Sequence, residues 1–236
     1  MPRRVVCLGD SITRGQVGVD YVKLLARGTC GGPNTFINAG VNGDLAENLL
    51  RRLDSVIDLR PDLATVLIGT NDVIASMSER NIRRVTRMKK LTTRPTIEGY
   101  CENLTAIVNR LAEETSARIG LLSLPVLGEE LGSESVRRSE RYSGVVKQIA
   151  ETCGVAYLAL NERQTAHLTA GGLTPGIAYR DGLGPLASAA IQHLVLRRSF
   201  DDISLRRGLE LTTDLVHQNT RGATMLAALV EQFVSQ

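Results

Sequence analysis

The chain has 236 residues, a length that favours one α/β domain over two small ones. Hydrophobic residues make up 43% of the chain, enough for a sizeable core, but aromatic residues are only 3% and tryptophan is absent. This composition argues against a surface that stacks carbohydrates or nucleic-acid bases. The formal net charge of +3 is too small for a general polyanion binder, so we expect no nucleic-acid partner.

Short aliphatic segments alternate with longer segments of helical periodicity. The aliphatic segments are rich in β-branched residues, as strands buried on both faces are, and lie at 4–9, 35–40, 63–69, 118–125 and 155–160. Apolar residues spaced by three and four predict helices at 19–28, 44–59, 96–115 and 134–153, with Gly28 and Gly154 as helix stops. The alternation predicts a flavodoxin-like three-layer α/β/α sandwich around a parallel sheet of about five strands.

Two intervals are too long to be ordinary connections between a strand and a helix. One is the segment 73–94 after the third strand, and the other is 161–213 after the fifth, which contains a helical pattern near 185–196. We expect each to have secondary structure of its own and a role at the rim of the sheet. The prediction is therefore a single domain over residues 1–236, with a rim or lid insertion at 161–213.

The cysteines and the first residues bear on where the protein resides. Cys7, Cys30, Cys101 and Cys153 have no metal-ligand spacing, and Cys7 and Cys153 lie in or beside strand-like segments, as buried thiols do. The apolar run after the basic start MPRR is too short for a secretory signal, and no segment approaches the length of a membrane helix. We expect a cytoplasmic protein without a membrane span, metal or cofactor, and we leave open a homo-oligomer.

Polar motifs follow several of the predicted strands. In sheets of this kind ligands bind beyond the carboxyl ends of the strands, so these are the segments that matter. GDSITRG (9–15) follows the first strand, NAGVNGDLAENL (38–49) the second and GTND (69–72) the third, and TTDLVHQNTRGATMLAALV (212–230) leads into a last helix.

This set of motifs resembles the SGNH, or GDSL-type, serine hydrolase family. The family's first block matches residues 9–15, its second matches Asn38, Gly40 and Gly43, and its third matches residues 69–72. Its last block, D-x-x-H, matches residues 214–217. The four blocks occur in the family's order and span nearly the whole chain, which makes the set far more specific than any one of them.

The chemistry of a serine nucleophile agrees with the resemblance. A serine hydroxyl needs a base within hydrogen-bond reach, and that base needs a third group to orient it. Ser11 would be the nucleophile, His217 the general base and then acid, and Asp214 the orienting carboxylate. The other two histidines, His167 and His193, have no carboxylate three residues before them.

The resemblance also implies an oxyanion hole formed by the backbone N–H groups of Ser11 and Gly43 and the side-chain amide of Asn71. Simpler interpretations stand beside it: Gly43 as a turn residue, and Asn71 with Asp72 as a strand-to-helix turn in which Asp72 caps a helix. Asp10 is interpreted as a helix cap or a brace for the turn that exposes Ser11, without a role in proton transfer.

Two segments leave alternatives open. RDGLGP (180–185) imitates a form of the family's last block but has Gly184 in place of the histidine, so either 214–217 is the true block or the chain is a pseudoenzyme.

The basic segment 80–94 could overhang the active site and attract an anionic substrate, although a solvated helical face is the favoured interpretation.

The sequence therefore predicts a cofactor-independent enzyme that hydrolyses a small-molecule ester or thioester through an acyl-enzyme on Ser11. Transfer of the acyl group to an alcohol would use the same residues. A catalytically silent binding module on the same scaffold is the alternative outside enzymes.

Overall fold

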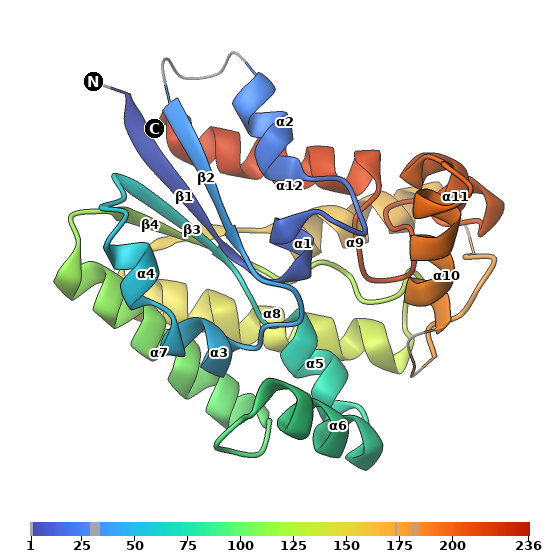
Figure 1. The fold of residues 1–236 in the computed structure, drawn as a ribbon, viewed down its shortest axis with the longest axis horizontal. Coiled ribbons are helices and arrows are strands. Elements are labelled where there is room, and N and C mark those ends of the chain that lie inside the picture. Colours follow the sequence, from blue (N-terminus) through green and yellow to red (C-terminus); the bar gives the residue numbers. More distant parts are fainter. Residues whose placement is uncertain (1, 29–33, 173, 181, 183) are drawn as a thin grey trace.

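A five-stranded parallel sheet forms the centre of the protein (Figure 1). The computed structural model describes residues 2–28, 34–172, 174–180, 182 and 184–236. The strands are β1 (Arg3–Gly9), β2 (Asn34–Gly40), β3 (Leu63–Leu67), β4 (Arg118–Leu122) and β5 (Ala156–Leu158). Their order is β2-β1-β3-β4-β5, with every neighbouring pair parallel, which confirms the predicted fold class.

Helices cover both faces of this sheet because the strand side chains alternate between two apolar cores. Val6 and Leu8 of β1 belong to one core, Val5 and Cys7 to the other, and all four are fully buried. The first core is covered by α3 (Ala46–Arg51), α4 (Asp54–Ile57), α5 (Thr70–Ser76), α7 (Ile97–Glu114) and α8 (Glu134–Cys153). The second is covered by α1 (Ser11–Arg14), α2 (Tyr21–Arg27), α9 (Leu160–Gly171) and α12 (Thr220–Ser235).

The direction in which the chain leaves the sheet changes between β1 and β3. After β1 it passes to the face covered by α2, and after β3 it passes to the face covered by α7. The carboxyl ends of these neighbouring strands lie side by side, with Gly9 paired to both Gly40 and Leu67. This is the switch point at which sheets of this kind bind ligands.

The predicted helix at 44–59 is wrong in one respect, because the structure has two short helices there. The chain tightens at Arg52 and Leu53, whose N–H groups donate to the carbonyls of Leu49 and Leu50, three residues back. Leu53 is fully buried, so the bend keeps an apolar side chain in the core. The other helices lie within one or two residues of their predicted bounds.

The two predicted helix stops differ in conformation. Gly154 ends α8 in the left-handed region at φ 65°, as a stop glycine typically does. Gly28 follows α2 with φ −70°, so it ends that helix without the left-handed cap.

Three further helices lie toward the end of the sheet where the strands terminate (Figure 1). They are α6 (Glu79–Lys89) in the first long interval, and α10 (Gly184–Leu194) and α11 (Phe200–Arg206) in the second. Within the part of the chain that the structure describes, no helix has the length and apolar character needed to cross a membrane.

The expected burial of two cysteines holds for one of them. Cys7 is buried within β1, whereas Cys153 ends α8 and is only partly buried, because the last turn of that helix reaches the surface. Cys101 is also partly buried, and Cys30 lies outside the described residues.

Candidate active site

Ser11 is presented by a sharp exit from β1. Asp10 is the N-cap of α1, and its Oδ1 accepts a hydrogen bond from Ile12 N at 2.9 Å. Gly9 allows the turn because a side chain there would clash: an added Cβ would lie 2.2 Å from Thr13 Oγ1 and 2.4 Å from Leu67 O. Ser11 is the first residue of α1 and is half-buried at the carboxyl end of the sheet.

His217 joins Ser11 to Asp214 through its two ring nitrogens. His217 Nε2 lies 2.9 Å from Ser11 Oγ, and Nδ1 lies 2.8 Å from Asp214 Oδ2. The other carboxylate oxygen of Asp214 accepts the backbone N–H groups of Val216 at 3.1 Å and His217 at 2.8 Å. The structure thus brings together three residues that the sequence separates by up to 206 positions.

The turn that carries this pair is strained and braced. Leu215 has a φ of 75°, a conformation that costs energy for a residue with a side chain. Gly128 N donates to Leu215 O at 2.9 Å, and Thr213 N donates to His217 O at 2.8 Å. These bonds fix the loop that holds Asp214 and His217.

Glu129 is a further brace, and the sequence analysis missed it. Its buried carboxylate accepts hydrogen bonds from the backbone N–H groups of residues 210, 211 and 212 and from the Thr212 hydroxyl, at 2.6 to 2.9 Å. Burial raises the pKa of the Glu129 carboxyl. A lone glutamate after a strand carries no motif, so only the fold reveals that it anchors the segment before Asp214.

Burial and pairing oppose each other in the Asp214–His217 pair. Burial alone would raise the pKa of Asp214, but the facing His217 ring and the two backbone N–H groups lower it below its ordinary value. Burial alone would lower the pKa of His217, but the Asp214 carboxylate, with a smaller contribution from Asp10, raises it. The ring is therefore held as a stronger base than a free histidine.

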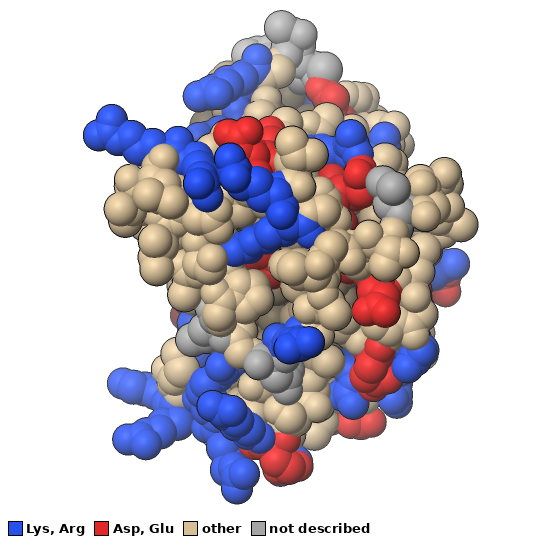
Figure 2. All heavy atoms as spheres, turned by 90° about the vertical axis from the view of Figure 1, so that its right-hand side faces the viewer, with Lys and Arg blue, Asp and Glu red and all other residues tan. Residues whose placement is uncertain are grey.

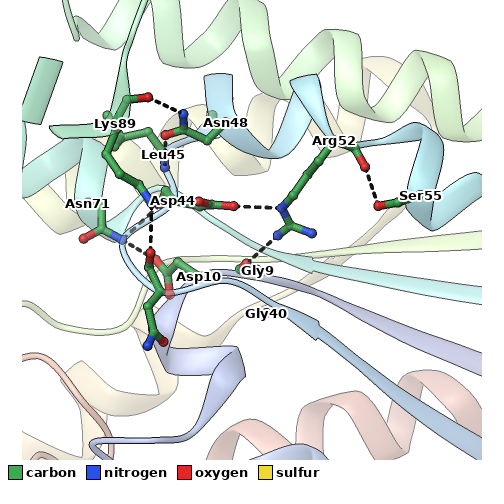
Figure 3. Close-up of polar contacts among 12 residues, drawn as sticks. Gly9, Asp10, Gly40, Asp44, Leu45, Asn48, Arg52, Ser55, Asn71 and Lys89 are labelled. Atoms are coloured by element: carbon green, nitrogen blue, oxygen red, sulfur yellow. Dashed lines mark hydrogen bonds and ion pairs between the residues drawn. The ribbon is translucent and has the colours of Figure 1, made fainter. Parts of the chain in front are cut away.

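Gly43 lies in the turn after β2, with a φ of 72° that favours glycine. The next residue, Asp44, is buried, and its carboxylate bridges two cations. Lys89 Nζ lies 3.0 Å from Asp44 Oδ1, and Arg52 Nε lies 2.8 Å from Oδ2 (Figure 3). Arg52 also donates to Gly9 O at 3.0 Å, so this network ties the Gly43 turn to the end of β1. Sequence analysis missed the role of Asp44.

Asn71 is the second residue of α5, and its amide is held between two acceptors. Nδ2 donates to Asp44 O at 3.0 Å and to Asp10 Oδ2 at 3.1 Å (Figure 3). The preceding Gly69 has a φ of 128° and packs against Tyr100, so close that an added Cβ would lie 2.7 Å from the ring. Asn71 is thus placed beside Ser11, with its side-chain N–H groups engaged by the protein.

Two buried aspartates support these turns. Burial raises the pKa of the Asp10 carboxyl to about 6. Burial, with the Asp10 carboxylate nearby, raises the pKa of Asp72 well above its ordinary value. Asp72 accepts a hydrogen bond from Ala46 N at 3.2 Å, so it caps the start of α3 and not its own helix.

All five main candidate residues line one cavity of about 260 Å³. They are Ser11, Gly43, Asn71, Asp214 and His217. Helix α6 forms another wall of this cavity. A further wall comes from the predicted rim insertion, through described residues in the range 179–186. One side of α6 therefore overhangs the cavity, as the alternative interpretation of the basic segment expects, while Arg83, Arg87 and Lys90 are exposed as on a solvated face. Arg84, Val85, Met88 and Lys89 line the cavity because helical spacing aligns them.

A family model matches this chain along almost its whole length. The model of the GDSL-like lipase/acylhydrolase family covers residues 7–224. The chain belongs to this family. It is accordingly a serine hydrolase that acts on ester bonds, which confirms the resemblance found in its motifs.

Solved structures share the fold of this GDSL-like hydrolase at low sequence identity. The acetyl xylan esterase AlAXEase has a TM-score of 0.69 at 18% identity, over 98% of this chain and 99% of that one. Axe2, an acetylxylan esterase from Geobacillus stearothermophilus, has 0.68 at 18%, over 99% and 94%. LAE5, an alpha/beta hydrolase from the metagenome of Lake Arreo, Spain, has 0.66 at 20%, over 99% and 96%.

Three of the similar solved structures are catalytic mutants of Axe2, in which a serine, an aspartate and a histidine are each replaced by alanine.

Comparison with curated proteins gives no match.

The other two histidines of the GDSL-like hydrolase have different surroundings. His167 Nε2 lies 3.7 Å from Glu210 Oε2. His193 Nδ1 lies 2.9 Å from Arg198 O, and its ring stacks on Phe200. The segment RDGLGP (180–185), which imitates the family's last block, lies at the same cavity. Its residues Arg180 and Gly182 line the cavity, while Asp181 and Leu183 lie outside the described residues.

Proposed function

We propose that the GDSL-like hydrolase cleaves a carboxylic ester or thioester through an acyl-enzyme on Ser11. His217 is the general base and then acid, and Asp214 orients it. The observation that carries this proposal is the continuous hydrogen-bonded path from Asp214 Oδ2 through both ring nitrogens of His217 to Ser11 Oγ. The residue types changed in the catalytic mutants of Axe2 support the same assignment.

The reaction has two halves. As Ser11 Oγ attacks the carbonyl carbon, its proton passes to His217 Nε2, and the carbonyl electron pair moves onto the oxygen. When the bond to the alcohol or thiol breaks, that group takes the proton from His217. Water then attacks the acyl-enzyme by the same route, which releases the acid and restores Ser11.

The negative oxygen of each intermediate needs donors on the far side of Ser11. We assign the Ser11 N–H, which lies in the first turn of α1 and has no acceptor within its helix, together with the Gly43 N–H and the Asn71 amide. One Asn71 N–H must change acceptor for this. The bond to Asp10 is the one we expect to exchange, because the bond to the Asp44 carbonyl keeps the amide anchored.

Acyl transfer to an alcohol would use the same residues, with the alcohol in place of water in the second half. Product analysis with an added alcohol acceptor separates the two reactions. The position of His217 against Ser11 argues against a catalytically silent binding module, because that contact activates a serine.

A fluorophosphonate probe tests the mechanism directly. We expect one covalent adduct, located on Ser11 by mass spectrometry of the digested protein, because only an activated serine reacts with this reagent. Labelling should vanish in Ser11→Ala and in heat-unfolded protein. A folded wild-type enzyme that takes up no probe, or a Ser11→Ala variant that is labelled as well as the wild type, would contradict the proposal.

The pH dependence follows from the raised pKa of His217. The ring must be neutral to accept the Ser11 proton, so kcat/KM should fall as the pH drops through a midpoint above the ordinary histidine value of 6.5. Asp214→Asn removes the carboxylate that raises this pKa, so the remaining activity should show a lower midpoint. The measurement is kcat/KM for a short p-nitrophenyl ester from pH 5 to 9. A wild-type midpoint below 6.5 would contradict the assignment of His217 as base.

A further inference from the structure

The cavity beside Ser11 combines apolar walls with two guanidinium groups. Arg84 projects from α6 and Arg180 comes from the segment before α10, so the two approach the cavity from different elements. Between them the lining is largely apolar, with Val85, Met88 and Leu186 among its members. Arg84 is half-buried and Arg180 is exposed, so both guanidinium groups can reach a ligand in the cavity.

Both guanidinium groups lack a partner among the residues that the structure describes. Among the described residues, Arg84 and Arg180 form no ion pair and no hydrogen bond. Lys89, the other cation of the lining, is occupied: its Nζ binds Asn42 O at 2.9 Å and Asp44 Oδ1 at 3.0 Å. The two arginines are therefore the cations of this wall that are available to a ligand.

Negative charge at the cavity is scarce and already paired. Among the described lining residues Asp214 is the one carboxylate, and it is committed to His217 and two backbone N–H groups. Figure 2 shows several groups of Lys and Arg side chains on this side of the molecule, with Asp and Glu side chains between them. A bound anion would meet attraction from the walls and little repulsion.

We propose that the substrate is an ester that carries an anionic group, a carboxylate or a phosphate, and that Arg84 and Arg180 bind this group. This inference rests on the proposed function, because it places the ester bond at Ser11. Arginine suits the task because its planar fork binds both oxygens of a carboxylate or phosphate at once. The apolar lining then contacts the rest of the substrate.

Matched substrates test the proposal. Four phenyl acetates differ only in the para substituent of the leaving group: carboxylate, phosphate, and the neutral methyl ester and carboxamide. A second pair places the charge on the acyl side, as mono-p-nitrophenyl succinate and its methyl ester. We expect kcat/KM for at least one anionic substrate to exceed that of its neutral match by about 10- to 100-fold. A hydrogen bond to a charged group typically contributes a binding free energy that corresponds to this ratio. The carboxylate and phosphate arms distinguish the two sources of charge.

Variants assign the effect to the two arginines. Arg84→Gln and Arg180→Gln should each reduce the preference for the anionic substrate about 10-fold, measured as the ratio of kcat/KM for the anionic substrate to kcat/KM for its neutral match. Arg83→Gln is the control, because Arg83 is exposed on the same helix and does not line the cavity. A preference lost equally in Arg83→Gln would overturn the proposal, since it would then reflect only the general charge of α6.

One measurement needs no variant. Phenyl phosphate or benzoate should inhibit hydrolysis of the neutral acetate by wild-type enzyme competitively, at concentrations at least 10-fold lower than benzamide does. The proposed anionic substrate class would be overturned if every neutral substrate were hydrolysed at least as fast as its anionic match and neither anion inhibited. The esterase mechanism would then still stand. Failure to hydrolyse any substrate, together with no fluorophosphonate labelling, would instead overturn the mechanism and the inference with it.

Discussion

Replacing Ser11 or His217 by alanine is expected to lower kcat/KM for p-nitrophenyl acetate by about 10⁴-fold or more. Ser11→Ala removes the nucleophile, and His217→Ala removes the group that takes its proton at 2.9 Å. Ser11 and His217 act together when the serine attacks the carbonyl carbon, so their losses should not add. We expect the rate of the double variant to lie within a few fold of the rate of the slower single variant. Initial rates of p-nitrophenol release, with enzyme concentration from active-site titration of the wild type, provide the measurement.

His193→Ala is the matched control for the histidine. His193 bonds the Arg198 carbonyl and stacks on Phe200, with no contact to Ser11, so its loss should leave kcat/KM within a few fold of the wild type. Circular dichroism spectra and melting temperatures show whether each variant is folded. A folded His217→Ala enzyme that keeps a tenth of the wild-type rate would refute the assigned base.

Asn71→Ala should lower kcat by about 10²- to 10³-fold and change KM much less. The amide is proposed to bind the oxygen only after it becomes negative, so its removal weakens the transition state more than the bound substrate. The variant also leaves the buried Asp10 carboxylate and the Asp44 carbonyl without a donor that each now has. We therefore expect some loss of thermal stability as well.

Asn103→Ala separates this effect from the general consequence of losing an asparagine. The Asn103 side chain donates to Gly99 O within α7, away from the cavity, so the variant should keep the wild-type kcat. If folded Asn71→Ala enzyme shows a raised KM with an unchanged kcat, the amide binds the ground state and is no part of an oxyanion hole.

Much of the site could be predicted from local sequence because its elements follow strand ends. Residues 9–15 combine a buried strand with a glycine and a capping aspartate, and each of these has a local physical meaning that the structure reproduces. The D-x-x-H motif implies a tight turn, and the carboxylate of Asp214 accepts both backbone and ring hydrogen bonds across those three residues.

Interactions between distant segments could not be predicted, because they depend on how the chain folds and not on local sequence. Glu129 carries no motif, and its importance arises because the fold places it against residues 210–212. Asp44 is likewise defined by Lys89 and Arg52. The break at Arg52 within the predicted helix 44–59 also depends on tertiary contacts, because the Arg52 side chain reaches back to Gly9 O.

The sequence by itself determined the parallel sheet, the family and the residue types available for catalysis, because strand burial, helical periodicity and short motifs are properties of local sequence. Only the tertiary structure decided that one side of the basic helix α6 faces the cavity, and that Arg84 and Arg180 approach it from two elements. Periodicity tells which residues of a helix share a face. What that face meets depends on how the chain packs.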